Sequence, residues 1–460
     1  SACRKCVRRK SDTKVASDSR RSWHRFSKLE CHFMFRFAHA ADLHLDSPFK
    51  GIRNTNEDVG EILRQATFAA YDNLIKLCID REVGALLIAG DVFDGGDHSL
   101  VGQIKFFEGL ERLNEHGIRA FICHGNHDPL DSWDAGLPIP ENVHRFGTDA
   151  ECVPVYADIP NSPVVCGISF PTREVRQSLL DRFPSRESQA FTIGLLHANV
   201  GSDSSHDSYA PCTIDDLKRV GYDYWALGHV HTRAVKHENE PWVVYSGNTQ
   251  GRHPNETGAR GVYVVTVNEV DHNRPVDMEF VPVDVVRWEQ GDLNIHDINL
   301  SDLKGHLQEI VEDLQRNADG RSLVYRIRLH GRGPLHTQLA QPDELDELTT
   351  WLNETWQDRR PFAWCGEIQD NTRSEIDRDQ LRKGEDFIGD FLKLTDERSR
   401  DQNLQNMLKE ELKPLFEHNR AKQHLDDILD TEANARFLLE AAEDTALDLL
   451  IAEDPMSGSD

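Results

Sequence analysis

The stretch YWALGHVHT, residues 224–232, begins as an apolar run typical of a buried strand and ends in two histidines one residue apart. Side chains alternate between the faces of an extended strand, so His229 and His231 should point to the same side beyond its C-terminal end. Similar apolar runs recur between residues 35 and 267, separated by amphipathic helical segments, which predicts an α/β layered domain. Ligands bind beyond the carboxyl ends of strands in open α/β sheets, so the two histidines indicate a candidate site.

Composition places the chain among soluble globular proteins. It has 460 residues, 38% of them hydrophobic, and a formal net charge of −27. The sequence contains no apolar run near the roughly 18 residues that suggest a membrane span. Nine cysteines scattered through apolar segments favour buried thiols in a reducing compartment, so we expect a cytoplasmic protein without a disulfide framework.

Changes in pattern divide the chain into four predicted parts. Residues 1–33 are basic, and the favoured interpretation is a leader before a natural start at Met34, either not native or disordered. A nucleic-acid-binding or targeting tail is the alternative. Residues 34–285 form the α/β domain, residues 286–340 follow a strand, helix and strand pattern, and residues 341–460 are charged and helical.

Five predicted strand ends carry side chains that can bind a metal ion. They are Asp42 and His44, Asp91 and Asp94, Asn126 with His127 and Asp128, His197, and His229 with His231. Mixed imidazole, carboxylate and amide donors suit Mn, Fe or Zn better than Mg or Ca, which prefer oxygen ligands. Each motif alone has an ordinary explanation as a turn, a cap or a core histidine. Their ordered occurrence behind five strands favours a centre for two metal ions.

These motifs carry a family resemblance. The ordered set D-x-H, G-D-x-x-D, G-N-H-D, H and G-H-x-H resembles the calcineurin-like metallophosphoesterases. HAADLHLDSPF (39–49) and GNTQGRHPNETGARG (247–261) resemble the SbcD-like, YhaO-type bacterial DNA-repair exonuclease subunits. The resemblance covers residues 34–333. It implies a four-layer α/β/β/α sandwich, a small α+β capping domain and a helical C-terminal region.

The resemblance also implies a dinuclear centre with Asp91 as the bridging ligand. One metal ion would be held by Asp42, His44, Asp91 and His231, and the other by Asp91, Asn126, His197 and His229. Mn²⁺ is the expected metal, with Fe or Zn as alternatives. Two such ions clamp a phosphodiester, lower the pKa of a bound water and stabilise the charge of the transition state.

The remaining polar residues receive supporting roles. We expect His127 to protonate the leaving oxygen or to stabilise the transition state, with Asp128 setting its tautomer and raising its pKa. Asp94 is expected outside the ligand set. Arg252 and His253, in a Gly-rich loop, are expected to contact the substrate phosphate. His39 and His124 precede the ligand motifs and are expected to be packing or supporting groups.

The predicted function is that of a Mn-dependent DNA exonuclease, with single-stranded DNA endonuclease activity as an addition. The resemblance implies DNA, a coiled-coil ATPase of the SbcC or YhaN type and a second copy of the chain as partners. A phosphoesterase for cyclic nucleotides or phosphoproteins and a non-catalytic scaffold subunit are the alternatives.

The acidic net charge opposes DNA binding unless basic residues gather locally. Arg326, Arg328, His330 and Arg332 fall on one face of a predicted strand, which indicates either a basic stripe or a solvated edge strand. The apolar stripes between residues 404 and 450 fit docking of the ATPase or a small helical bundle with its own core.

Overall fold

The computed structural model describes residues 34–47, 49, 57–95, 99–132, 138–186, 189–201, 209–268, 276–401, 403–416 and 431–452. The predicted basic leader, residues 1–33, lies outside these ranges. The chain divides into two compact units. The first comprises residues 1–331 and 338–371, and the second comprises residues 332–337 and 372–460.

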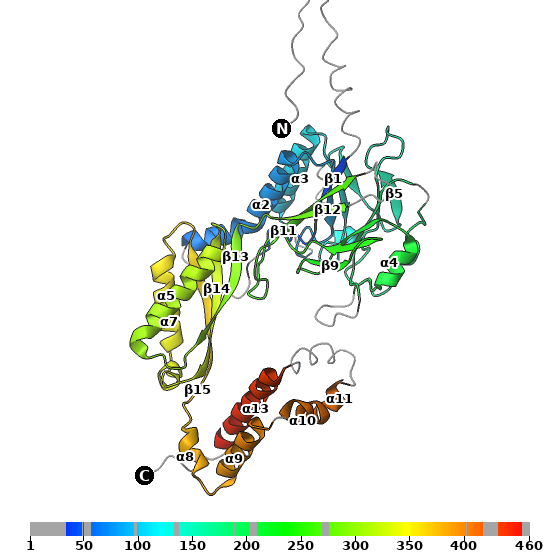
Figure 1. Cartoon of the computed structure of the whole chain (residues 1–460). Helices are drawn as coiled ribbons and strands as arrows, with labels where there is room; N and C mark the ends of the chain where they lie inside the picture. Colours follow the sequence, from blue (N-terminus) through cyan, green and yellow to red (C-terminus); the bar gives the residue numbers. More distant parts are fainter. Residues whose placement is uncertain are drawn as a thin grey trace, which may run out of the picture. The chain divides into compact units, whose positions relative to one another are not determined.

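Two six-stranded sheets form the centre of the first unit (Figure 1). The first has the strand order β12 (Val276–Pro282), β11 (Gly261–Asn268), β1 (Met34–Ala40), β2 (Ala85–Ala89), β3 (Arg119–Cys123) and β4 (Val143–Arg145). The second has the order β5 (Glu151–Pro154), β6 (Val164–Gly167), β7 (Thr192–His197), β8 (Tyr224–Gly228), β10 (Trp242–Tyr245) and β9 (Ala234–His237). Strands β1 to β4 are mutually parallel, and so are β6, β7, β8 and β10.

Helices cover the outer faces of both sheets. The helical segments of this region are α2 (Glu57–Asp80), α3 (Leu100–Glu115), α4 (Ile214–Val220), η1 (Leu130–Ser132) and η2 (Leu180–Arg182). Alternation along β2 turns Leu86 and Ile88 towards the core shared with α2 and α3, and turns Leu87 towards the second sheet. A third core lies between the second sheet and α4, where Trp225 and Leu217 are buried. The four-layer α/β/β/α sandwich predicted from the sequence is therefore confirmed.

A third, three-stranded sheet completes the first unit. Its strands are β13 (Val286–Asn294), β14 (Ser322–Arg332) and β15 (Ala363–Arg373), and its helices are α5 (Leu300–Asn317), α6 (His336–Leu339) and α7 (Glu344–Trp356). Trp288 and Trp364 of this sheet pack against Val59 and Leu63 of α2. The sequence pattern predicts only helices beyond residue 340, so β15 was missed. Its apolar and buried residues are only Ala363, Trp364, Cys365 and Ile368, which leaves too short a strand signal.

The second unit is helical, as predicted. Its helices are α8 (Arg378–Arg382), α9 (Phe387–Ser399), α10 (Leu404–Glu411), α11 (Lys413–Phe416) and α13 (Glu432–Ala452). Leu404 and Ala435 are buried where α10 meets α13, and Leu408, Leu412 and Leu438 pack around them. The two apolar stripes noted in the sequence thus share a small core.

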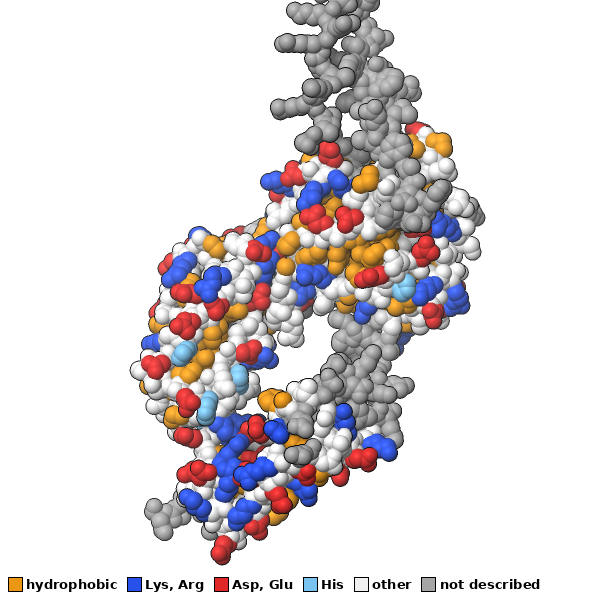
Figure 2. All heavy atoms as spheres, in the orientation of Figure 1, with side chains coloured by type: hydrophobic (Ala, Val, Ile, Leu, Met, Phe, Trp, Pro, Cys, Tyr) orange, Lys and Arg blue, Asp and Glu red, His pale blue; other side chains and the backbone are white. Residues whose placement is uncertain are grey.

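The basic residues of β14 are paired with carboxylates. Arg326 bonds Glu367 at 3.0 Å, Arg328 bonds Asp292 at 2.7 Å, and Arg332 pairs with Asp448. Figure 2 shows basic and acidic side chains interspersed over the face in view. The described arginines of this strand therefore form cross-strand and inter-element ion pairs, which weakens the interpretation as a free basic stripe.

The cysteines depart in one respect from the sequence expectation. Cys152 and Cys166 form a disulfide, because they lie directly opposite each other in the antiparallel pair β5 and β6. The thiols of Cys78, Cys123, Cys212 and Cys365 are buried and free, as expected. Among the described helices, none combines the length and apolar character needed to cross a membrane.

Candidate metal centre

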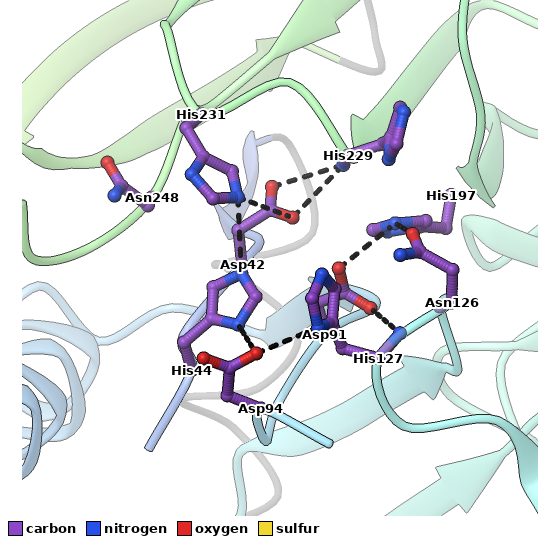
Figure 3. Close-up of polar contacts among 12 residues, drawn as sticks. Asp42, His44, Asp91, Asp94, Asn126, His127, His197, His229, His231 and Asn248 are labelled. Atoms are coloured by element: carbon purple, nitrogen blue, oxygen red, sulfur yellow. Dashed lines mark hydrogen bonds and ion pairs between the residues drawn. The ribbon is translucent and has the colours of Figure 1, made fainter. Parts of the chain in front are cut away.

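The strand ends singled out in the sequence meet at one edge of the sandwich (Figure 3). Asp42 and His44 follow β1, Asp91 and Asp94 follow β2, Asn126, His127 and Asp128 follow β3, His197 ends β7, and His229 and His231 follow β8. The loops after β1 and β2 are joined by backbone hydrogen bonds, in which Asp42 N donates to Gly90 O and His44 N donates to Asp91 O. Residues distant in sequence therefore surround one space.

The backbone at this edge is strained. Asp42, His44, Asp91 and His229 have positive φ angles of 51°, 43°, 51° and 94°. Residues other than glycine rarely adopt positive φ angles, because this conformation costs of order 1–3 kcal/mol for each residue. Such strain persists where the surrounding structure holds a functional conformation, and here it occurs at four residues that border a common space.

A first group of donors consists of Asp42, His44 and His231, whose donor atoms lie within 4.8 Å of one another. Nε2 of His44 and Nε2 of His231 are 3.2 Å apart. Nδ1 of His231 is 2.6 Å from Oε1 of Glu256, which fixes the proton on Nδ1 and leaves a lone pair on Nε2. This is the arrangement that metal-binding histidines commonly show.

A second group forms around Asp91. Nε2 of His197 lies 3.3 Å from Oδ2 of Asp91 and 3.0 Å from Oδ1 of Asn126. Nδ1 of His197 is 2.9 Å from the carbonyl of Ala89, so the neutral ring directs its Nε2 lone pair at these two oxygens. Three acceptors then face one another, an arrangement that requires a cation or a proton between them.

The protonation of His197 agrees with this requirement. Burial lowers the pKa of His197, but the carboxylates of Asp91 and Asp42 and the carbonyl of Ala89 together outweigh burial and raise the pKa to about 9. Asp42 also belongs to this group, with donor atoms within 4.8 Å of those of Asp91 and His197. The two groups therefore adjoin at Asp42 and Asp91, and their mixed imidazole, carboxylate and amide donors fit two transition-metal ions.

His229 contributes its backbone in the described geometry. Its amide N donates to both carboxylate oxygens of Asp42, each at 3.1 Å. Its ring lies beside His197, with ring centroids 5.2 Å apart (Figure 3). The ring belongs to neither of the two groups of donors nor to the cluster of His44, Asp94 and His127, so its place in the predicted ligand set remains a prediction.

His127 pairs with Asp94. Nδ1 of His127 is 2.8 Å from Oδ1 of Asp94, and this hydrogen bond raises the pKa of His127. The sequence predicts this role for Asp128, which follows His127 directly in the chain. The carboxylate of Asp128 is buried and accepts from the backbone N of Val92 at 2.8 Å and of Gly125 at 3.0 Å. Asp128 therefore holds the loops after β2 and β3 together, and Asp94 is the residue that contacts the histidine.

Arg252 and His253, the residues expected to contact the substrate phosphate, form hydrogen bonds within the protein. The guanidinium of Arg252 is buried and donates to Ser47 and to Oδ2 of Asp94, the latter at 3.1 Å. Nδ1 of His253 accepts from the backbone N of Asn255 within its own loop. In the described geometry, Arg252 acts on the site through Asp94, and the hydrogen bond of His253 is local.

Sequence reasoning missed Glu256 and Ser47. Glu256 lies in the same Gly-rich loop as Arg252, so a carboxylate among the loop's polar residues was the available signal. Ser47 follows the D-x-H motif, and its hydroxyl donates to Oδ2 of Asp94 at 2.7 Å. His39 is fully buried between Tyr224 and Leu227, so it is a packing group, in agreement with the sequence interpretation.

Comparison with known proteins agrees with this geometry. Residues 35–233 match the family model described as calcineurin-like phosphoesterase, and residues 288–373 match the middle domain of metallophosphoesterase YhaO. The chain belongs to the calcineurin-like metallophosphoesterase family, whose fold implies a dinuclear site for divalent metal ions.

Individual relatives show which members of the family the chain resembles. The chain is 34% identical to the uncharacterized metallophosphoesterase YhaO of Bacillus subtilis over 75% of this chain and 84% of that protein. It is 27% identical to the DNA double-strand break repair protein Mre11 of Sulfurisphaera tokodaii, over 42% of this chain and 49% of that protein. It is 24% identical to the SbcD polypeptide of the nuclease SbcCD from Bacillus subtilis, over 50% of this chain and 66% of that protein. The chain is thus a metallophosphoesterase related to nucleases.

Proposed function

We propose that the chain is a cytoplasmic, Mn-dependent DNA exonuclease that hydrolyses phosphodiester bonds at a dinuclear centre. The observation that carries the proposal is the convergence of three metal-capable side chains, in which Nε2 of His197 lies 3.3 Å from Oδ2 of Asp91 and 3.0 Å from Oδ1 of Asn126. The names of the Mre11 and SbcCD relatives support DNA as the substrate.

The proposed ligand sets are those predicted from the sequence; relative to the two groups of donors, they add Asp91 to the first group and His229 to the second. One ion is held by Asp42, His44, Asp91 and His231, and the other by Asp91, Asn126, His197 and His229. Two divalent ions bound by these residues would supply Lewis-acid stabilisation of the phosphoryl oxygens and would lower the pKa of a bound water, which would serve as the nucleophile. Glu256 orients the ring of His231, and the carbonyl of Ala89 orients that of His197.

His127 is proposed as the general acid. Its side chain is 42% exposed, whereas those of His44 and His197 are buried, so it can reach a substrate. Asp94 accepts a hydrogen bond from Nδ1 and raises the pKa of His127, which favours the protonated ring. Nε2 then donates a proton to the leaving oxygen.

Arg252 and Ser47 are proposed to position Asp94. Both donate to its Oδ2, which leaves Oδ1 for His127. A carboxylate held by two donors keeps one orientation, so the histidine is held in one orientation as well. Direct contact of Arg252 or His253 with the substrate phosphate remains part of the prediction.

The second unit is proposed to bind an SbcC-like or YhaN-like coiled-coil ATPase. Phe387 and Leu394 of α9 and Phe437 and Leu449 of α13 are exposed hydrophobic side chains, at 50% to 73% of their surface. An apolar helix face suits helix-in-groove docking. A homodimer is also proposed, and it is supported by exposed Leu100 and Val101 on α3.

Digestion of an end-labelled DNA duplex tests the proposed activity. The protein is assayed with and without Mn²⁺, beside His127→Ala and the control His306→Ala, which removes an exposed histidine of α5. We expect wild type and His306→Ala to shorten the DNA in a metal-dependent way. His127→Ala should lose this activity and keep its metal content. Hydrolysis of a small phosphodiester without DNA cleavage, even after the ATPase is added, would favour another phosphoester as substrate.

A further inference from the structure

A cavity of about 210 Å³ adjoins the candidate metal centre. Three loops form it, contributing residues 231–233 after β8, 246–248 after β10 and 257–260 before β11. His231 lies in its wall and also belongs to the first group of metal-capable donors, and Asn248 of the wall lies beside His231 in Figure 3. The cavity and the centre therefore share one residue, His231.

Arg260 places a buried positive charge in the wall of the cavity. Its side chain is 7% exposed and donates to His231 O at 2.5 Å, Asn248 Oδ1 at 3.1 Å and Thr257 O at 2.9 Å. All three acceptors are neutral. Within the described part of the chain, no ion pair joins Arg260 to a carboxylate. A buried cation without an anionic partner carries a desolvation penalty that neutral acceptors offset only in part.

Arg233 brings a second positive charge to the same cavity. Its guanidinium lies 4.0 Å from the ring centroid of Phe280 and donates to Ala259 O at 3.4 Å, and the side chain is exposed. Burial lowers the pKa of Arg260, the carboxylates of Glu256, Asp284 and Glu289 oppose that effect, and the charge of Arg233 adds to it. The two arginines are therefore close enough to repel each other.

Three carboxylates act on Arg260, those of Glu256, Asp284 and Glu289, and the first two are committed to other partners. Glu256 accepts from Nδ1 of His231 and from the backbone N of Arg252. Asp284 pairs with Arg287 at 3.1 Å and with Arg321 at 2.8 Å. Neither can neutralise the two arginines of the cavity without breaking these contacts. An anion entering the cavity would do so directly.

We propose that this cavity binds a phosphate of the nucleic-acid substrate. This phosphate is the neighbour, along the nucleic-acid strand, of the phosphate that reacts at the metal centre. The inference rests on the proposed function. The shared wall at His231 places the two phosphates side by side, and arginine guanidinium groups are well suited to phosphate oxygens. The exposed hydroxyls of Thr232 and Thr257 offer further donors. Drug-sized pockets occupy roughly 300–1,000 Å³, so this smaller cavity suits a phosphate with part of its sugar.

The test uses chromogenic substrates in which release of p-nitrophenol fixes the reacting phosphate. One substrate is the p-nitrophenyl ester of thymidine monophosphate, with a single phosphate. The others are p-nitrophenyl esters of thymidine dinucleotides, with the ester at either end, so that a second phosphate lies on either side. Matched dinucleotides carry a neutral methylphosphonate in place of that second phosphate. Wild type, Arg233→Ala and the control Arg219→Ala, an exposed arginine of α4, are compared with Mn²⁺.

In wild type, the second phosphate should lower KM about tenfold for one of the two dinucleotides, as expected for a charge-assisted contact. The methylphosphonate and Arg233→Ala should each remove this advantage, and together they should have no additional effect. Arg219→Ala should keep the advantage. All three proteins should hydrolyse the single-phosphate ester equally and melt at the same temperature, since Arg233 is exposed.

The outcomes distinguish failure of the proposed function from failure of the proposed phosphate subsite. If wild type hydrolyses none of the esters with Mn²⁺, the proposed function is wrong. If it hydrolyses them but gains nothing from a second phosphate, or if Arg233→Ala keeps the gain, the phosphate subsite is wrong. An equal loss on the single-phosphate ester would show that Arg233 supports the loops and does not bind a second phosphate.

Discussion

Oδ1 of Asp94 lies 2.8 Å from Nδ1 of His127, while Oδ2 of the same carboxylate accepts from Ser47 and Arg252. One carboxylate thus connects a buried arginine to the most exposed histidine of the candidate centre. The hydrogen bond to His127 lowers the pKa of Asp94, and the same bond raises the pKa of His127. The pair therefore favours the ionised carboxylate and the protonated ring.

Asp94→Asn should lower the pKa of His127, because the acceptor loses its charge. A general acid is active when protonated, so the alkaline limb of the pH profile of kcat should shift to lower pH. At pH 8 the rate should fall by about 10²-fold or more, in the range of general acid catalysis. Asp94→Glu, which keeps the charge, should retain more activity. An unchanged alkaline limb in Asp94→Asn would show that Asp94 does not affect the proton transfer.

Glu256→Ala should weaken binding of one of two metal ions by about 10–100-fold, since the ring of His231 loses the partner that fixes its proton. Titration of metal-free protein with Mn²⁺, followed by calorimetry, measures both affinities. Glu279→Ala is the control, because Glu279 pairs with Arg81 on the surface. Equal affinities in Glu256→Ala and wild type would contradict the assignment of His231.

His39 should make stability fall in mild acid. Burial lowers the pKa of His39 from 6.5 to about 3, so between these values the unfolded chain binds a proton that the folded chain excludes. Stability is therefore full above pH 6.5 and decreases below it, by about 1.4 kcal/mol at pH 5.5. Urea unfolding at pH 7.5 and 5.5 measures this loss. His39→Gln should show a smaller loss, and an identical loss would assign the effect to other groups.

Gly228 and Gly305 should respond oppositely to alanine. A Cβ on Gly228, at the end of β8, would lie 1.8 Å from the carbonyl oxygen of Ala89 in the facing sheet, so the strand ends would have to separate. Gly228→Ala should lower the melting temperature and reduce metal binding. Gly305 lies within α5 with nothing within 4 Å of its Cβ position, and Gly305→Ala should stabilise by up to about 1 kcal/mol. Equal melting temperatures would contradict the close approach.

The sequence predicted the sandwich and the gathering of its strand ends because both follow from local periodicity. Apolar runs such as that before His229 indicate buried strands, and polar residues behind parallel strands meet at one edge. The convergence of Asp42, His44, Asp91, Asn126, His197 and His231 could therefore be expected from the amino-acid sequence.

Contacts that depend on loop conformation were not predictable in this way. Asp128 follows His127 in the chain, yet its carboxylate turns into the backbone of Val92, and Asp94 takes the contact with the ring. Glu256 reaches His231 from a loop that has no periodic pattern. Arg233 and Arg260 lie in the wall of one cavity because the loops after β8 and before β11 meet there.

Anomalous diffraction from crystals grown with Mn²⁺ would test the central claim most directly. Two peaks roughly 3.5–4 Å apart are predicted, the usual spacing of a two-metal centre. Both should lie within bonding distance of Asp91, one beside His44 and His231 and the other beside Asn126 and His197. A single peak, or peaks that do not contact Asp91, would contradict the dinuclear centre.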